Sequence, residues 1–213
     1  MGPAELEARS KHGSTAFLYA CEKGSAECIV ELAEAGCDTT ARNSNGGTGL
    51  MHAAALSGAA AVEAVLAVGG AELDATDDKG ATAFLTACHK GQVDCIRALA
   101  EAGCNRAAAS QNGRTALMLA ICVEPTTSAT AAVKAVLNSG DLTELELEAR
   151  DDNDLTAFLI ACRTGNLQCM ADLQVVGCDT FARSERGCGT KLRWTRVQSL
   201  LNLAKQSIWS ARR

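Results

Sequence analysis

The chain repeats itself, and this repetition constrains its fold more than any other feature of the sequence. Three segments align without gaps, each reading Thr-Ala-Phe-Leu-x-Ala-Cys from Thr15, Thr82 or Thr156. Two looser copies begin at Thr48 and Thr115, so successive threonines are 33, 34, 33 and 41 residues apart. A near-constant period of this length indicates a solenoid, in which each unit buries its apolar face against its neighbours.

Each unit predicts two short helices followed by a turn. Apolar residues after the threonine, such as Phe17, predict a first helix that ends at a glycine able to adopt a positive φ. The spacing of Cys28, Ile29, Leu32 and Ala33 predicts a second helix with one buried face. The polar residues before the next threonine predict a tight, hairpin-like turn. Because neither helix can bury its apolar face alone, the units are expected to stack.

This helix–turn–helix–loop pattern with a period near 33 residues resembles the ankyrin repeat over about residues 5–186. The matching motifs are Gly-x-Thr-Ala at the start of a unit and Ala-Gly-Cys-Asp or Ala-Gly-Cys-Asn after the second helix, at Ala35 and Ala102. The family's Thr-Pro-Leu-His is altered, and His52 stands one place late, so the usual histidine hydrogen bond is missing. The resemblance implies an all-α ankyrin-repeat solenoid of stacked helix-turn-helix units with short hairpin loops.

The unit boundaries follow from the threonine spacing. We expect a partial repeat loop at 1–12, a basic amphipathic tail or cap at 187–213, and repeats at 13–45, 46–79, 80–112, 113–153 and 154–186. The fourth unit is eight residues longer than 33. Its extra residues predict a bulged helix–helix turn near 123–127 and a longer hairpin near 141–147. The odd units resemble one another more than the even ones, which suggests a copied two-unit block with a period near 67.

The cysteines follow the same repeat. Nine of the eleven form triplets with spacings of seven and nine residues: Cys21, Cys28, Cys37; Cys88, Cys95, Cys104; and Cys162, Cys169, Cys178, which leaves Cys122 and Cys188. They are interpreted either as buried small residues or as a metal or redox array. The first interpretation is favoured because zinc ligands typically include a C-x₂₋₄-C pair, which this sequence lacks.

No motif indicates catalysis. The histidines His12, His52 and His89 belong to separate units, and the sequence has neither a phosphate-binding glycine loop nor an H-E-x-x-H motif. The acid pairs Asp77-Asp78 and Asp151-Asp152 are predicted to be solvated turn residues whose side chains bond to their own backbone. We therefore expect no catalytic residues, no cofactor and no metal.

Charge is distributed unevenly. Residues 1–186 hold 14 Lys and Arg against 25 Asp and Glu, whereas residues 187–213 hold six Lys and Arg and no acid. The acidic body argues against nucleic acid as a partner. An apolar stripe in the tail has helical spacing: Trp194, Val197, Leu201, Ala204, Ile208 and Ala211. This stripe predicts a helix that caps the solenoid, or contact of the tail (191–213) with a partner protein or an acidic membrane surface.

The resemblance implies a non-catalytic scaffold that binds a partner protein, of unknown identity, through the concave face of the repeat stack. The expected partner-binding residues lie at the hairpin tips and first-helix ends: Lys11, His12, Glu22, Lys23, Ser44, Asn45, Asp78, Lys79, His89, Lys90, Gln111, Asn112, Arg114, Asp152, Asn153, Arg163 and Thr164.

Two alternatives remain open. One is an ankyrin-repeat fragment that regulates a catalytic or channel domain of a longer protein. The other is a cysteine-based metal or redox sensor. The chain has no apolar run of the roughly 18 residues that a membrane span needs. We therefore expect it in the cytoplasm, with the nucleus as the alternative location. We also expect it to be a monomer.

Overall fold

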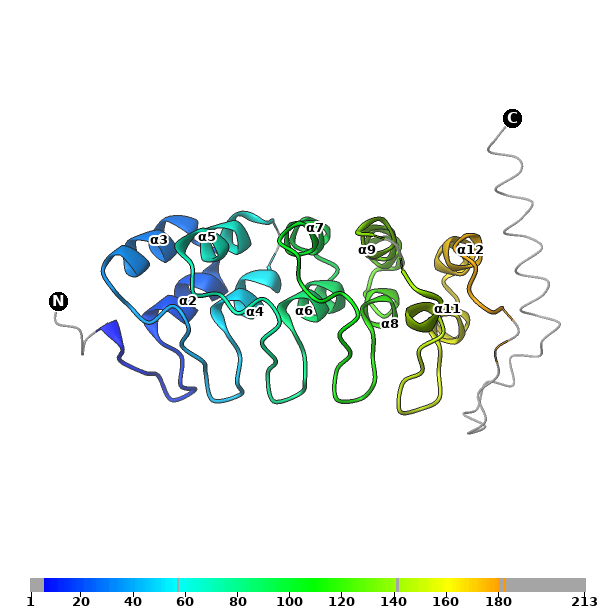
Figure 1. Ribbon diagram of the computed structural model, residues 1–213, viewed down its shortest axis with the longest axis horizontal. Helices are drawn as coiled ribbons and strands as arrows, with labels where there is room; N and C mark the ends of the chain where they lie inside the picture. Colours follow the sequence, from blue (N-terminus) through cyan, green and yellow to red (C-terminus); the bar gives the residue numbers. More distant parts are fainter. Residues whose placement is uncertain (1–5, 57, 141, 181, 183–213) are drawn as a thin grey trace, which may run out of the picture.

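The computed structural model describes residues 6–56, 58–140, 142–180 and 182, and within these ranges the chain forms a stack of helix pairs (Figure 1). The pairs in chain order are α2 (Ala16–Lys23) with α3 (Ala26–Glu34), α4 (Gly49–Ala54) with α5 (Ala60–Val68), α6 (Ala83–Lys90) with α7 (Val93–Glu101), α8 (Ala116–Ile121) with α9 (Thr126–Asn138), and α11 (Ala157–Thr164) with α12 (Leu167–Val175). A short helix, α10 (Glu144–Leu147), lies in the loop before the last pair. The predicted all-α ankyrin solenoid is confirmed.

The helices form two rows, and the loops project from one side of the stack as hairpins (Figure 1). The first helices of successive pairs contact one another in a first row, and the second helices do the same in a second row. The described loops contain only isolated β-bridges, Arg42 to Thr48 and Ala109 to Thr115, at the bases of two hairpins. The predicted tail at 187–213 lies outside the described residues.

A threonine starts every first-row helix because its hydroxyl can cap the exposed backbone amides. The Oγ1 atoms of Thr15, Thr48, Thr82 and Thr156 each accept a hydrogen bond from the amide three residues later, at 3.2–3.4 Å. Thr115 differs, because its Oγ1 is buried and has no hydrogen-bond partner. The repeated threonine therefore precedes all five first-row helices, and its hydroxyl caps four of them.

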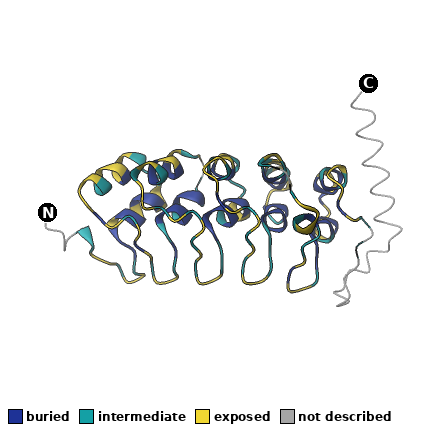
Figure 2. Ribbon diagram, viewed as in Figure 1, coloured by how far each residue is buried: buried dark blue, intermediate teal, exposed yellow. Residues whose placement is uncertain are grey.

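The core lies between the two rows and between successive units (Figure 2). Phe17, Phe84 and Phe158 are all buried on first-row helices, which agrees with the interpretation of each first helix as apolar. In α3, however, only Ile29 is fully buried, and Cys28 is exposed, contrary to the expected buried face.

The exposure of Cys28 follows from its position in the stack. The equivalent Cys95 lies against the preceding unit, where its thiol donates to the carbonyl oxygens of Leu56 and Gly58 at 3.4 and 3.3 Å. Cys169 is likewise buried, and its sulfur is 3.9 Å from Oγ1 of Thr130. Within the described residues, α3 is the first helix of the second row, so no earlier unit covers Cys28.

The fourth unit places its extra residues in helices. Helix α9 has 13 residues, against nine in α7, although each begins eleven residues after its unit's threonine. The buried Val133 and Val136 occur four residues later in their unit than Ile96 and Leu99 do in theirs. The predicted bulged turn is therefore an additional turn at the start of α9.

The longer loop after α9 is also helical in part. It contains α10, which begins with a capping box: Oγ1 of Thr143 accepts from the amide of Glu146, and the Glu146 carboxylate accepts from the amide of Thr143. The extra residues of this loop are thus stabilised locally rather than left as an extended hairpin.

Alternate junctions between units carry different hydrogen bonds, and this alternation has the same two-unit period as the sequence. At every second junction an acidic side chain accepts from a backbone amide 31 residues later: Glu7 from Asp38, Asp74 from Asn105, and Glu148 from Asp179, at 2.6–2.7 Å. The junction between the first and second units instead uses Arg42, which pairs with Glu72 at 2.8 Å.

The threonine caps lead to a prediction for stability. Replacement of Thr82 by Ala should lower the free energy of unfolding by about 1 kcal/mol, since the mutation removes an N-cap hydrogen bond. Replacement of Thr115 by Ala is the matched control, and it should leave stability unchanged or raise it, because the lost hydroxyl is buried without a partner. Urea unfolding followed by circular dichroism measures both. Equal destabilisation by the two variants would contradict this assignment of the caps.

Candidate protein-interaction surface

The hairpin tips of neighbouring units are joined by backbone hydrogen bonds. Amides of Ser44, Asp78, Gln111 and Asp152 donate to carbonyl oxygens of the preceding tip, each at 3.0 Å; the acceptors are His12, Asn45, Lys79 and Asn112. Four successive junctions share this bond. The tips therefore form one continuous edge in which backbone positions are held and side chains remain available.

A side-chain acceptor at the base closes each hairpin. Oδ1 of Asp77 accepts from the amides of Lys79 and Ala81 at 2.9 and 2.8 Å, and Oδ1 of Asp151 accepts from two amides in the same way. Asn43, Ser10 and Ser110 occupy the corresponding places. The first acid of each predicted pair thus bonds to its own turn, as expected. Asp151 is buried rather than solvated.

Sixteen of the seventeen predicted partner-binding residues are exposed. They lie on the hairpin tips and on the last turns of α2, α6 and α11. We call the seventeen predicted partner-binding residues the tip face. Its hairpin members lie on the side of the stack from which the loops project (Figure 1).

Arg114 is the exception, because its side chain is only 31 % exposed. Its Nε lies 3.8 Å from Oδ2 of Asp151, whose side chain is fully buried. Arg114 therefore also has a structural role, as the cation next to a buried carboxylate in the neighbouring hairpin.

Two histidines of the first row have lowered pKa values. Burial lowers the pKa of His52, so its Nε2 can accept from the amide nitrogen of Asn43 at 3.1 Å. This bond ties α4 to its hairpin. Burial also lowers the pKa of His89, and the positive charges of Lys90, Arg114 and Lys79 lower it further.

The two rows carry opposite excesses of charge. The first-row helices together hold three Lys or Arg residues and one Glu. The second-row helices hold seven Asp or Glu residues and two Lys or Arg residues. The second-row helices are therefore net acidic, whereas the first-row helices, three of which end in the tip face, are net basic.

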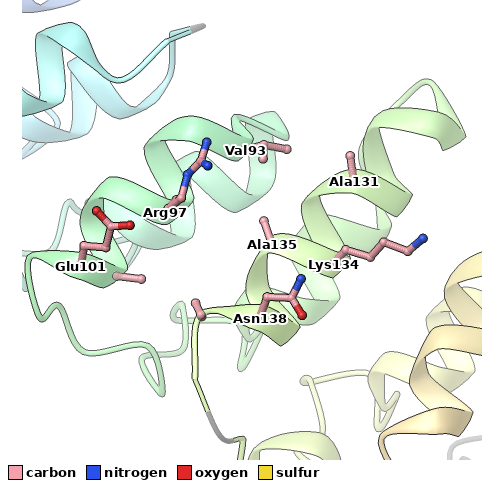
Figure 3. A pocket seen from close by; sticks show the side chains of 9 residues that line it. Val93, Arg97, Glu101, Ala131, Lys134, Ala135 and Asn138 are labelled. Carbon is pink, nitrogen blue, oxygen red and sulfur yellow. The ribbon is translucent and has the colours of Figure 1, made fainter.

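A hollow of about 440 Å³ lies between α7 and α9 in the second row (Figure 3). Its walls include the small side chains Ala100, Ala131 and Ala135, with Arg97 and Lys134 among the charged residues around them. None of these residues was predicted as a site. The extra turn of the fourth unit, next to a run of alanines, was the sequence feature that could have indicated it. Its mixed charges identify no ligand class.

Eight of the ten described cysteines have the properties of core residues. All ten are thiols, and eight are buried. Burial raises the pKa of eight thiols: to about 12 for Cys21 and Cys178, to about 11 for Cys95, Cys104, Cys162 and Cys169, and in the same direction for Cys37 and Cys88. A thiol with a raised pKa is a poor nucleophile and a poor metal ligand at neutral pH, because the thiolate performs both roles.

Two further observations concern the described ranges as a whole. They contain no group of three or more His, Cys, Asp or Glu side chains arranged to hold a metal ion. In the same ranges, no helix combines the length and apolar character needed to cross a bilayer.

Thiol labelling tests this account of the cysteines. In a Cys188→Ser background, the native protein should show one rapid reaction with Ellman's reagent, from the exposed Cys28, with the half-buried Cys122 next in rate. Cys28→Ser should remove the rapid phase, and Cys95→Ser, the matched control, should retain it. Rapid reaction of several buried thiols without denaturant would support the redox alternative instead.

Comparison with known proteins agrees with this architecture. The sequence profile described as ankyrin repeats (3 copies) matches residues 2–77 and 50–144. The chain is also 28 % identical over 123 residues to the E3 ubiquitin-protein ligase KEG of Arabidopsis thaliana. That alignment covers 57 % of this chain and 8 % of the relative, so the chain spans a small part of the relative's length. The profile match and the capped helix pairs together show that the chain belongs to the ankyrin-repeat family.

Proposed function

We propose that this protein is a non-catalytic module that binds a partner protein through the tip face. Its membership of the ankyrin-repeat family supports protein interaction as the general role. The observation that carries the specific proposal is the combination of a bonded backbone and exposed side chains along the hairpin tips. A surface ordered before binding loses little conformational entropy when a partner binds, which favours affinity.

The composition of the tip face indicates what kind of interface it makes. Its exposed members are polar or charged, and none is Phe, Trp or Tyr. Interfaces without Trp or Tyr anchors lack the residues that most often dominate binding energy. We therefore expect a polar interface of modest affinity, in which charge and hydrogen bonding select the partner.

Peptide display on the full chain tests the location of the interface. Ligands selected from a library of disordered peptides should lose binding to a tip-face variant, Lys11→Ala, Gln111→Ala and Arg163→Ala. They should still bind a matched second-row variant, Glu31→Ala, Glu63→Ala and Glu101→Ala, because all six residues are exposed and only the first set lies on the tip face.

Each variant must retain the wild-type melting temperature for the comparison to count. Selected ligands that lose binding to the second-row variant but keep binding to the tip-face variant would place the interface on the other row and overturn the proposal.

A second candidate is that these repeats recruit or regulate targets for a catalytic domain of a longer protein. The match to a ubiquitin ligase, of which the aligned repeats form only 8 %, favours this candidate. Both candidates use the same surface and differ in what the repeats are covalently joined to. A transcript that continues the reading frame into a catalytic domain would distinguish the second from the first.

A further inference from the structure

Units two, three and four place four basic side chains on neighbouring parts of the tip face. Lys79 lies at the tip of the third hairpin, Arg114 lies on the fourth hairpin, and His89 and Lys90 end α6 between them in the sequence. The carbonyl oxygen of Lys79 accepts from the amide of Gln111 at 3.0 Å, which holds the two hairpins in register. We call these four residues the basic cluster.

The three cations of the basic cluster all act electrostatically on the imidazole of His89. After burial, the groups that lower the pKa of His89 are Lys90, Arg114 and Lys79, in that order, and all three are cations. A field that disfavours a proton on His89 favours a negative group at the same place. The three cations therefore act on one shared region of the surface.

In the part of the chain that the structure describes, the charged groups that shift the pKa of His89 are all cations. The nearby carboxylates have contacts of their own. Oδ1 of Asp78 lies over the second hairpin, 3.0 Å from the position that a Cβ would occupy on Gly46. Oδ1 of Asp151 accepts from the amides of Asn153 and Leu155, and its Oδ2 lies near Arg114. Asp152, at the tip of the fifth hairpin, is the remaining exposed acid on the adjoining tips.

We propose that the basic cluster binds a short acidic segment of the partner protein, so that carboxylates lie between the third and fourth hairpins. This inference rests on the proposed function and adds the chemistry of the partner to it. A short segment fits better than a nucleic acid, because residues 1–186 carry 25 acids against 14 Lys and Arg and would repel a long polyanion beyond the cluster.

Fluorescence anisotropy with labelled octaglutamate, octaglutamine and octalysine tests the proposal on the full chain. Octaglutamate should bind the wild type more tightly than the other two peptides. Its affinity should fall when the salt concentration rises from about 50 to about 300 mM, because exposed charges are screened over this range.

Charge reversal locates the binding site. Lys79→Glu with Lys90→Glu should weaken octaglutamate binding by about tenfold or more, since two attractions become repulsions. The matched control, Arg97→Glu with Lys134→Glu, changes the net charge equally on the second row and should weaken binding by less than about threefold. Arg114 is left intact because its contact with the buried Asp151 would mix stability with binding.

Nuclear magnetic resonance gives a second readout that depends on the position of the ligand. Bound carboxylates should raise the pKa of His89, because they offset the cations that lower it. The pKa of His52 should not change, since His52 lies in the second unit and its side chain is bonded to Asn43. An unchanged pKa of His89 at saturating octaglutamate would place the peptide elsewhere.

Besides an unchanged pKa of His89, three outcomes overturn the inference: octaglutamate binding no tighter than octaglutamine binding, equal weakening by the two charge-reversed variants, or an oligothymidylate that binds more tightly than octaglutamate. Failure here is distinct from failure of the proposed function. Display ligands that are neutral or basic, yet lose binding to the tip-face variant, would leave the interface in place and remove only its acidic specificity.

Discussion

Packing between successive units is the constraint on which the rest of this structure depends. A single helix pair cannot bury its apolar face, so each first-row helix rests on the next. The contact is close enough to select residue size: a Cβ on Gly49 would lie 2.7 Å from Cε1 of Phe17 and 3.0 Å from Sγ of Cys21. Phe17, Phe84 and Phe158 recur in alternate units and are all buried. The two-unit period of the sequence is therefore also found in the packing of the first-row helices.

The same stacking separates the residues that maintain the fold from those that are available for binding. In the third hairpin, Asp77 bonds to its own turn, whereas the neighbouring Asp78 is exposed at the tip. The backbone bond from each tip to the next then fixes the spacing of the exposed side chains. Changes at the tips can therefore alter the chemistry of the surface at little cost in stability, which is how one repeat architecture serves different partners.

Most of the fold could be predicted from the sequence, because each position of the unit occurs in several copies. A position that is apolar in every copy is predicted to be buried. Four of the five threonine caps and the three phenylalanines of the Thr-Ala-Phe-Leu segments behave as the pattern predicts. The predictions that needed correction concern places where a unit's surroundings differ from the average. Cys28 is exposed because no described unit precedes it, and the extra residues of the fourth unit extend α9 because they can continue a helix.

The sequence by itself determined the repeat, the helix starts, the all-α class and the excess of acid over base, since each depends on local residue identity or on spacing along the chain. Only the tertiary structure decided which charged side chains act together. Lys79, Lys90 and Arg114 are up to 35 residues apart in the chain. The stacking of two hairpins beside α6 places all three where their positive charges lower the pKa of His89. It also showed that Arg114 contacts a buried carboxylate. Electrostatic interaction depends on distance through space, which spacing along the sequence does not specify.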